Sequence, residues 1–452
     1  MEKKNTVTLD KTMLTLLEEK KYTTLRDILV TMNPVDIAAL FDNLPQERLP
    51  MLFRLLPKEL AAETFVEMDE EAEEILITGF SDNELKEVID ELYVDDAVDL
   101  VEEMPANVVM RILRQADPDM RKMINEILNY PEDSAGSIMT TEYVGLRSTM
   151  TVEEAIKRIR RTGVDKETIY TCYVTEPNRK LIGSVSIRTL LFAEDKEIIG
   201  DIMEQNVISV HTLDDQEEVA QTLNKYDLLA LPVVDRENRL VGIVTVDDAM
   251  DVMQEEATED IEIMAAITPS DKPYLKTGVF ETWRKRIPWL LLLMVSATFT
   301  GMIITSFEDA LAAQVALTAF IPMLMDTGGN SGSQASVTII RGLSLNEIEF
   351  RDLPRVLWKE IRVSLLCGVT LAAANFCKLL WFDRVGVWIA LVVTLTLVVT
   401  VFFAKVVGST LPILSKKIGF DPAVMASPFI TTIVDALSLV IYFQIASLLL
   451  GL

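Results

Sequence analysis

An aspartate lies in the middle of the last strongly apolar stretch of this 452-residue chain. Residues 428–435 read PFITTIVD, and Asp435 is the first charge in that run. A charge at the centre of a bilayer costs about 3 kcal/mol even on insertion scales, so this carboxylate should face water or protein. The last apolar stretch contains no basic residue, and Lys405 in the preceding one is the only candidate partner at similar depth. We interpret Asp435 as an ion site, with a buried structural pair as the alternative.

A second segment, DTGGNSGSQ at residues 326–334, combines three glycines with small polar residues. Such a composition predicts a break in a spanning helix, and irregular backbone at membrane depth is tolerated only beside protein or a water-filled cavity. Asp326, Asn330 and Gln334 supply polar side chains beside the glycines. We therefore interpret the segment as a pore lining. Close helix packing at a GxxxG-like site is the alternative.

The ligands that these segments offer are carboxylate, amide, hydroxyl and carbonyl oxygens, and His211 is the only histidine in the chain. Zinc, copper and iron sites normally use several imidazoles or thiolates, so this set indicates a hard cation. Magnesium dehydrates reluctantly, and a pore for it needs a wide, oxygen-lined passage with a few carboxylates that act partly through water. A symmetric dimer would place a second Asp435 on the same axis, and two facing carboxylates would make a divalent-cation site. An enzyme is not expected, because the sequence contains no nucleophile–base constellation or phosphate-cradling loop.

Long apolar stretches recur from residue 287 onward, and they must position these residues. Each has a length near or above the roughly 20 residues that a helix needs to cross a bilayer. Five spans fit best, at residues 287–307, 310–340, 356–382, 385–414 and 422–452. The basic residues of the connecting segments then gather on one side of the membrane, and the cluster at residues 283–286 marks the inner end of the first span. We expect a multi-pass protein of the cytoplasmic membrane with its C-terminus outside.

The charge of the chain divides at the same point. Residues 1–280 contain 58 acidic and 29 basic residues, a net charge of 29 − 58 = −29, while the remainder contains 11 acidic and 13 basic residues. This balance excludes nucleic acid as a partner and favours cations, although an acidic surface can also serve solubility alone. No apolar signal segment follows Met1, and three scattered cysteines indicate a reducing compartment. The first 280 residues are therefore expected in the cytosol.

The acidic part begins with short helical units. Between residues 33 and 129 the sequence repeats amphipathic segments of about 12 residues, in which apolar side chains recur at helical spacing and prolines end the helices. Asn33 and Ser81 are expected to cap two of these helices. Helices this short are not stable alone, so we predict a small solenoid of stacked hairpins.

An internal duplication follows, with strand, turn, strand and helix patterns at residues 171–188 and again at 230–248. It resembles a tandem pair of CBS domains. In that family a glycine, two apolar residues, Thr or Ser and a nearby acid hold the ribose and phosphate of an adenosine nucleotide. The second copy keeps this pattern at Gly242, Thr245 and Asp248, whereas the first copy has Thr189 in place of the acid. The candidate contacts for ATP are Arg188, Thr245, Asp247 and Asp248, and a purely dimerising spacer is the alternative.

An acid-rich connector at residues 252–275 is expected to be largely helical. With its motifs YPEDSAGSIMT (130–140), GGNSGSQ (328–334) and DPAVMASPFITTIVD (421–435), the chain resembles the MgtE-type magnesium channels over essentially its whole length. The resemblance implies a multidomain homodimer: an all-α helical-repeat N-domain (1–130), two α/β CBS domains (131–200 and 201–255), a long connecting plug helix (256–283) and a five-helix transmembrane pore domain (284–452).

The resemblance also implies metal-binding residues. Asp435 corresponds to the pore acid that binds hydrated magnesium, and Asp421 at the inner mouth would meet the plug. The other implied pore positions are Gly328, Asn330, Ser333, Ser427 and Thr431. The implied regulatory acids are Asp95, Asp99, Asp215, Glu217, Asp227, Asp248, Asp251, Glu256, Glu259 and Asp260. Ser333 and Ser427 stand where a pore asparagine can occur, so the preference for magnesium over manganese, cobalt or calcium stays open.

The expected function is magnesium uptake gated by intracellular magnesium. Without bound cation the acidic faces repel one another, and with magnesium they close and the plug helices shut the pore. Two other functions remain open at this point. The chain could be a proton-coupled divalent-cation transporter, or a membrane-anchored magnesium or nucleotide sensor that conducts no ions.

Overall fold

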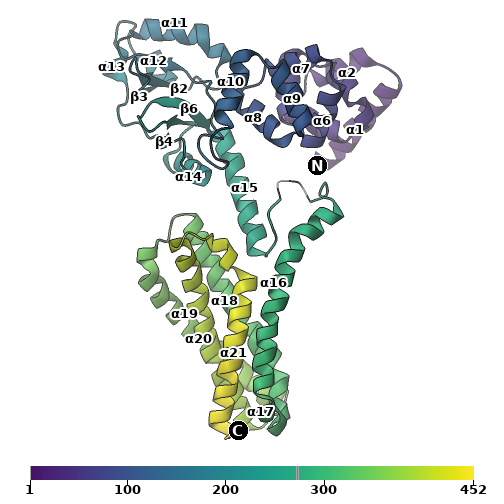
Figure 1. Cartoon of the computed structure of the whole chain (residues 1–452), viewed down its shortest axis with the longest axis vertical. Helices are drawn as coiled ribbons and strands as arrows, with labels where there is room; N and C mark the ends of the chain where they lie inside the picture. The colour runs from purple at the N-terminus through teal and green to yellow at the C-terminus, as the bar shows by residue number, and fades with distance from the viewer. Residues whose placement is uncertain (1, 271, 273, 452) are drawn as a thin grey trace. The chain divides into compact units, whose positions relative to one another are not determined.

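The computed structural model describes residues 2–270, 272 and 274–451, and omits the side chains of 2–8, 10, 165 and 427. The chain divides into two compact units, Met1–Met253 and Gln254–Leu452. The first contains the helical repeats and two small sheets, and the second contains the long apolar helices (Figure 1).

Short helices form the first part of unit 1, as the repeats predict. They are α1 (Glu2–Glu18), α2 (Tyr22–Leu29), α3 (Pro34–Asp42), the 3₁₀ helix η1 (Gln46–Arg48), α4 (Leu49–Phe53), α5 (Lys58–Val66), α6 (Glu70–Gly79), α7 (Asp82–Ile89), α8 (Val94–Glu103), α9 (Ala106–Gln115) and α10 (Pro118–Ile127). The two expected caps are confirmed: Asn33 accepts from the Val35 amide, and Ser81 forms a capping box with Glu84. The apolar faces meet in one continuous core.

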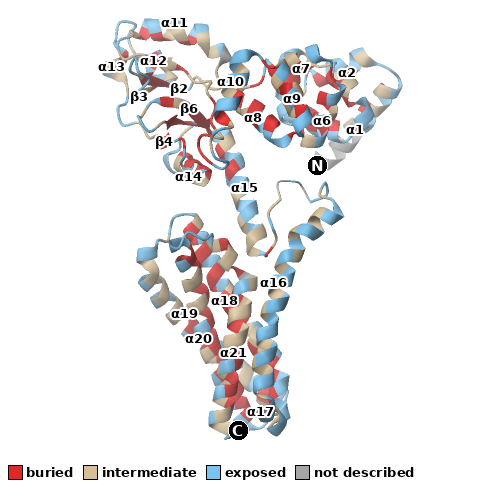
Figure 2. Cartoon of the chain, viewed as in Figure 1, coloured by how far each residue is buried: buried red, intermediate tan, exposed pale blue. Residues whose placement is uncertain are grey.

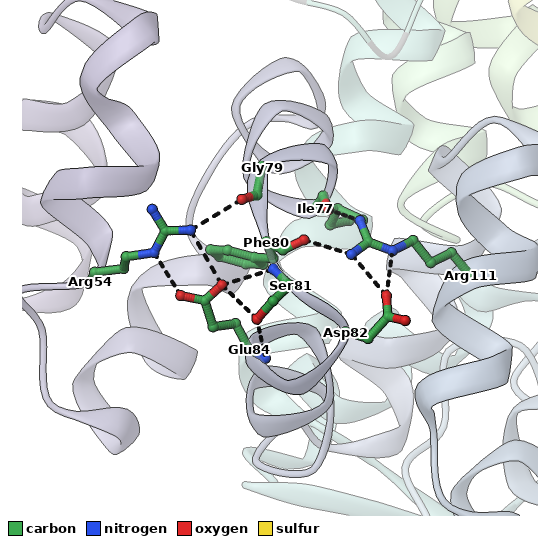
Figure 3. A network of polar contacts seen from close by, with 8 residues as sticks. All are labelled: Arg54, Ile77, Gly79, Phe80, Ser81, Asp82, Glu84 and Arg111. Carbon is green, nitrogen blue, oxygen red and sulfur yellow. Dashed lines mark hydrogen bonds and ion pairs between the residues drawn. The ribbon is translucent and has the colours of Figure 1, made fainter.

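Two arginines form hydrogen bonds between neighbouring repeats (Figure 3). Arg54, just after α4, donates from Nε to Glu84 at 2.6 Å, and Arg111 of α9 donates from Nε to Asp82 at 3.2 Å and from Nη2 to the carbonyl of Phe80 at 2.6 Å. The hydrogen bond from Arg54 lowers the pKa of Glu84 to about 2. The polar groups around the α6–α7 turn are thus paired with side chains from both adjacent repeats.

The duplication predicted from the sequence is confirmed by two three-stranded sheets. Strands β1 (Gly145–Leu146), β2 (Thr171–Thr175) and β3 (Leu181–Ser186) form one sheet, and β4 (Val210–His211), β5 (Ala230–Val234) and β6 (Leu240–Thr245) form the other. Each sheet has one parallel and one antiparallel pairing, with a register shift at the same place. The accompanying helices are α11 (Val152–Thr162), η2 (Gly163–Asp165), α12 (Ile187–Phe192), α13 (Ile199–Ile202) and α14 (Gln216–Tyr226).

The connector helix differs from the expectation. Helix α15 runs from Val246 to Met264, so it starts within the second sheet domain and ends eleven residues before Leu275. A turn in which the Ser270 amide donates to Glu262 follows it. The acid-rich pattern extends no further than Glu262, and the Thr268-Pro269 sequence then disfavours helix.

Unit 2 consists of long helices. They are α16 (Val279–Ser306), α17 (Glu308–Ala313), η3 (Val315–Phe320), α18 (Ile321–Ser344), η4 (Phe350–Asp352), α19 (Leu353–Trp381), α20 (Val387–Lys417), η5 (Pro422–Met425) and α21 (Ser427–Leu450). Among the described residues, four segments are long and apolar enough to cross a membrane, and they contain α16, α19, α20 and α21. Helix α18 is long enough, at about 36 Å, but its polar residues lower its hydropathy.

Two expectations about the second span are wrong. The helix begins at Ile321 rather than near residue 310, because α17 and η3 occupy the preceding residues. The glycine-rich segment does not break it either, since α18 is continuous through Gly328, Gly329 and Gly332. Helical hydrogen bonding satisfies the backbone, and close packing by neighbouring helices compensates the low helix propensity of glycine.

Helices α18, α20 and α21 pack against one another, and α19 lies against α20 (Figure 1). Helix α16 differs from them because none of its residues is buried (Figure 2). Only its C-terminal end joins the apolar core, where Phe307 stacks on Phe443 of α21 with ring centroids 4.5 Å apart. The first turns of α16 contribute no residue to the apolar cores of the described chain.

Candidate ion site

The two motifs singled out in the sequence meet where α18 packs against α21. A Cβ atom built on Gly329 would lie 3.0 Å from the Thr431 Cγ2 atom and 3.7 Å from the Asp435 Oδ1 atom. The absence of a side chain at Gly329 thus lets the α18 backbone approach the carboxylate directly. Asp435 is half-buried, and Thr431, one turn earlier on α21, donates its hydroxyl to the carbonyl of Pro428.

A polar face runs along the same part of α18. Asp326, Asn330 and Gln334 follow one another at four-residue spacing, and all three are exposed, while Ser333 is half-buried. Asp435 of α21 faces Gly329, which lies between Asp326 and Asn330 in the sequence of α18. Oxygen ligands from α18 and α21 therefore gather on one side of this helix pair, as a hard-cation site requires.

The other predicted pore residues lie in different surroundings. Gly328 is buried, and a Cβ atom there would lie 2.7 Å from Thr400 of α20 and 2.8 Å from the Ser438 hydroxyl of α21. Gly328 is therefore a position where α18 packs closely against both α20 and α21. Ser427 is the first residue of α21, and its side chain lies outside the described residues.

Lys405 does not neutralise Asp435. Its Nζ atom lies 3.8 Å from Glu360 of α19, and the two side chains are only 6% and 13% exposed. Glu360 was not predicted as a partner, and it lies in α19 among basic residues. Because Lys405 is paired with Glu360, Asp435 has no cationic partner at ion-pair distance among the described residues.

The segment that precedes α21 packs against the end of the connector helix α15. Asp421 is exposed and accepts from the Ala423 amide at 2.7 Å, which starts η5. Ile263 and Met264 of α15 pack against a small apolar cluster of Ile340, Ala423 and Ala426. Nearby, the Ser344 hydroxyl donates to Asp260 at 3.3 Å. The last turn of α15 thus contacts both α18 and the segment that carries Asp421.

A separate acidic cluster lies within unit 1, where α8 approaches the second sheet domain. Its central member is Asp95, whose Oδ1 atom is buried without a hydrogen-bond partner. Burial, followed by repulsion from Asp96 and Asp248, raises the pKa of Asp95 well above its usual range. Burial and Asp248 likewise raise the pKa of Asp96 to about 6. The structure therefore brings Asp95 and Asp248, two predicted regulatory acids, into one electrostatic environment.

Other acids extend this cluster. The pKa of Asp99 is raised to about 7 by its desolvated surroundings and by Asp96, although part of the side chain reaches solvent. Glu167 and Glu73 were not predicted, and desolvation raises the pKa of each to about 8. Glu73 is 6% exposed in α6, and Glu167 lies in the first sheet domain. Only the spatial arrangement shows that these two belong to the cluster.

The remaining predicted regulatory acids are distributed along two helices. Asp215 caps α14, Glu217 lies in its first turn and Asp227 ends it in a left-handed conformation. Asp251, Glu256 and Glu259 follow one another along α15. Within the described residues, no three acidic, histidine or cysteine side chains converge closely enough to hold one metal ion together. An ion shared by these acids would therefore have to draw them closer.

The candidate nucleotide motif is ordered at the start of α15. The Thr245 hydroxyl donates to Asp248 at 2.5 Å and the Thr245 amide donates to the same carboxylate at 3.3 Å, while Asp247 is exposed. In the first copy, Ser186 accepts from the Thr189 amide in the corresponding turn, beside Arg188. The second copy thus retains the hydroxyl–carboxylate pair that the first copy lacks.

Three family models match the chain. A divalent cation transporter model covers residues 321–445, the MgtE intracellular N domain covers 32–133, and CBS domains cover 135–196 and 199–255. The magnesium transporter MgtE of Thermus thermophilus is 39% identical over 96% of this chain and 97% of its own length, and that of Bacillus subtilis is 33% identical over 96% of both. The cytosolic domain of the Mg²⁺ channel MgtE, solved in complex with ATP, is 38% identical, with a TM-score of 0.52 over 54% of this chain and 99% of that domain. The chain therefore belongs to the MgtE family of magnesium transporters, multidomain membrane proteins with cytosolic N-terminal domains rather than enzymes.

Proposed function

We propose that this chain conducts magnesium into the cell through a pore lined by α18 and α21. The observation that carries the proposal is Asp435, a half-buried carboxylate in an apolar helix that faces a glycine of α18 and has no cationic partner among the described residues. An unpaired carboxylate within a membrane-spanning helix is energetically unfavourable, so we expect Asp435 to bind the cation that moves through the pore. Five spans, with α18 as the second, and an external C-terminus complete the proposed topology.

The pore is proposed to form between two copies of the chain. Asp326, Asn330 and Gln334 are exposed on one face of α18, and exposure of such a face to lipid would be unfavourable. Two-fold symmetry would cover both faces around a water-filled passage and bring two Asp435 carboxylates together. Such a pair provides the charge that a hydrated divalent ion requires.

Ion flux into liposomes that contain the purified full-length chain tests this function. We expect magnesium uptake down its gradient without any proton gradient, and competition among magnesium, manganese, cobalt and calcium will give the selectivity. Uptake that requires a proton gradient would instead identify a coupled transporter. No flux under any gradient, with intact magnesium binding, would identify a sensor and contradict the proposal.

Gating by intracellular magnesium is proposed to act through the acidic groups of unit 1 and of α15. Asp95 and Asp248 are destabilised by desolvation and mutual repulsion, so a bound divalent ion would favour a closed arrangement. The end of α15 already contacts α18 and the Asp421 segment. A movement that closes the cytosolic part would therefore also move α15, and the end of α15 would act on the inner end of the pore.

Magnesium should protect the cytosolic part of the full-length chain from limited proteolysis. In the double variant Asp95→Asn with Asp248→Asn, the magnesium concentration for half-maximal protection should rise by about tenfold, the loss typical when a group that supports a metal is removed. The matched control is Asp36→Asn with Asp119→Asn, two exposed acids in the first turns of α3 and α10. Equal digestion with and without magnesium would refute the gating proposal.

ATP is proposed to bind the second sheet domain and tune the magnesium response. The ordered Thr245–Asp248 pair supports this role, as does the likeness to the ATP-bound cytosolic domain. Thr245→Val should weaken ATP binding by about tenfold, because one buried hydroxyl hydrogen bond is lost. Ser186→Ala in the first copy should leave the affinity unchanged. Calorimetry on the full-length chain measures both, and equal effects would contradict the assignment to the second copy.

A further inference from the structure

A cavity of about 470 Å³ lies at the start of the first long apolar helix. The turn that precedes α16 forms one wall, and the first three turns of α16 form the other. The residues that line it are Tyr274, Leu275, Thr277, Val279, Thr282, Trp283, Arg286, Ile287 and Leu290. All of them belong to unit 2, and none belongs to the ion site or to the acidic cluster.

The cavity combines one positive charge with an apolar and aromatic wall. Arg286 is exposed and has no hydrogen-bond or ion-pair partner among the described residues, whereas the neighbouring Lys285 lies 3.8 Å from Glu281. Trp283 is 58% exposed and Tyr274 is 73% exposed. Aromatic rings with a polar edge beside a basic group are typical of the headgroup layer of a membrane.

The position of the cavity agrees with this chemistry. Because the N-terminal domains of the family are cytosolic, the start of α16 lies at the cytosolic surface of the membrane. That leaflet is negatively charged and attracts basic residues next to a span. Below the cavity, exposed apolar side chains such as Leu291 and Met294 continue along α16, none of whose residues is buried (Figure 2).

We propose that this cavity binds an anionic phospholipid of the cytosolic leaflet, with the phosphate on Arg286 and the acyl chains along the exposed face of α16. Charge complementarity identifies the occupant. A guanidinium without a protein partner favours a phosphate, and the apolar surface that continues into the membrane favours an attached acyl chain over a free ion.

The site is joined to the connector between the two units of the chain. The Thr268 amide donates to the carbonyl of Lys285 at 3.2 Å, and the Ser270 amide donates to Glu262 of α15 at 2.8 Å. Residues 268–270, which precede in the sequence the turn that forms one wall of the cavity, therefore contact both α16 and the end of α15. A bound lipid would stabilise this turn and so restrict the end of the connector helix.

Quenching of Trp283 fluorescence tests the proposal on the full-length chain in vesicles. Brominated phosphatidylglycerol is added as the quencher to phosphatidylcholine vesicles, and brominated phosphatidylcholine is the neutral comparison. Trp283→Phe gives the background from the other tryptophans. We expect phosphatidylglycerol to quench Trp283 more strongly than phosphatidylcholine does, and Arg286→Gln to weaken this preference by about fivefold, as for one basic residue at an anionic surface.

Arg284→Gln is the matched control, because Arg284 is exposed two residues away on α16 but does not line the cavity. Arg286→Lys should retain most of the preference. If Arg284→Gln and Arg286→Gln lose the preference for phosphatidylglycerol equally, the attraction is a general effect of positive charge near the membrane, and the proposal is overturned. Absence of quenching by either lipid would show that protein, such as a second copy of the chain, covers this face, and it would overturn the proposal as well.

Discussion

Asp435→Ala should reduce magnesium flux in liposomes by at least about a hundredfold, the upper range for loss of a group on which metal binding depends. In the proposed dimer one substitution removes both carboxylates of the site, and the described residues offer no other charge on α21 to replace them. Asp435→Asn should be nearly as inactive, because it keeps the shape and an oxygen ligand but loses the charge. The variant chain should still fold, since no described cation is paired with Asp435.

Asp309→Ala is the control for this experiment. Asp309 is also an acid of unit 2, but it is exposed at the start of α17, away from the contact between α18 and α21. Its replacement should leave the flux unchanged. Magnesium flux in Asp435→Ala at the level of the unmodified chain would exclude this carboxylate from the ion path. If Asp435→Ala loses flux but magnesium still protects its cytosolic part from proteolysis, then conduction and sensing depend on different residues.

The elements that follow from local patterns could be predicted from the sequence. The short helices of the N-terminal part are set by apolar spacing, by prolines and by caps such as Ser81, all within a few residues of one another. The duplicated sheets follow from two similar strand patterns. Asp435 could be identified because a charge in a long apolar run is unfavourable without a function or a partner.

The features that the sequence did not reveal depend on contacts between distant segments. Lys405 pairs with Glu360, and the two are separated by most of α19 and more than half of α20. Glu73 and Glu167 join the cluster around Asp95 from other elements. Spacing along one helix carries no information about such partners. The expected break at the glycines of α18 was wrong for the same reason, because the neighbouring helices that pack closely against these glycines lie far away in the sequence.

Gly408→Ala should destabilise the membrane unit and reduce flux together. A Cβ atom at Gly408 of α20 would lie 2.2 Å from the carbonyl oxygen of Gly332 and 3.2 Å from its Cα atom, so the backbones of α20 and α18 must separate. Overpacking of this kind costs about 1–3 kcal/mol, and more where only backbone can move. Gly332 also packs against Ile430 of α21, so the shift would alter the contact that places Gly329 beside Asp435.

Gly301→Ala distinguishes this steric effect from the general effect of replacing a glycine within a helix. Gly301 lies in the interior of α16, and a Cβ atom there would meet nothing within 4 Å. Its replacement should leave flux unchanged and raise thermal stability slightly, because alanine favours helix. Thermal unfolding and flux measured on the same preparations therefore separate the two classes of variant: Asp435→Ala loses flux at unchanged stability, whereas Gly408→Ala loses both. A stable and active Gly408→Ala chain would show that α18 and α20 are further apart in the membrane, and the packing that positions Asp435 would then have to be different.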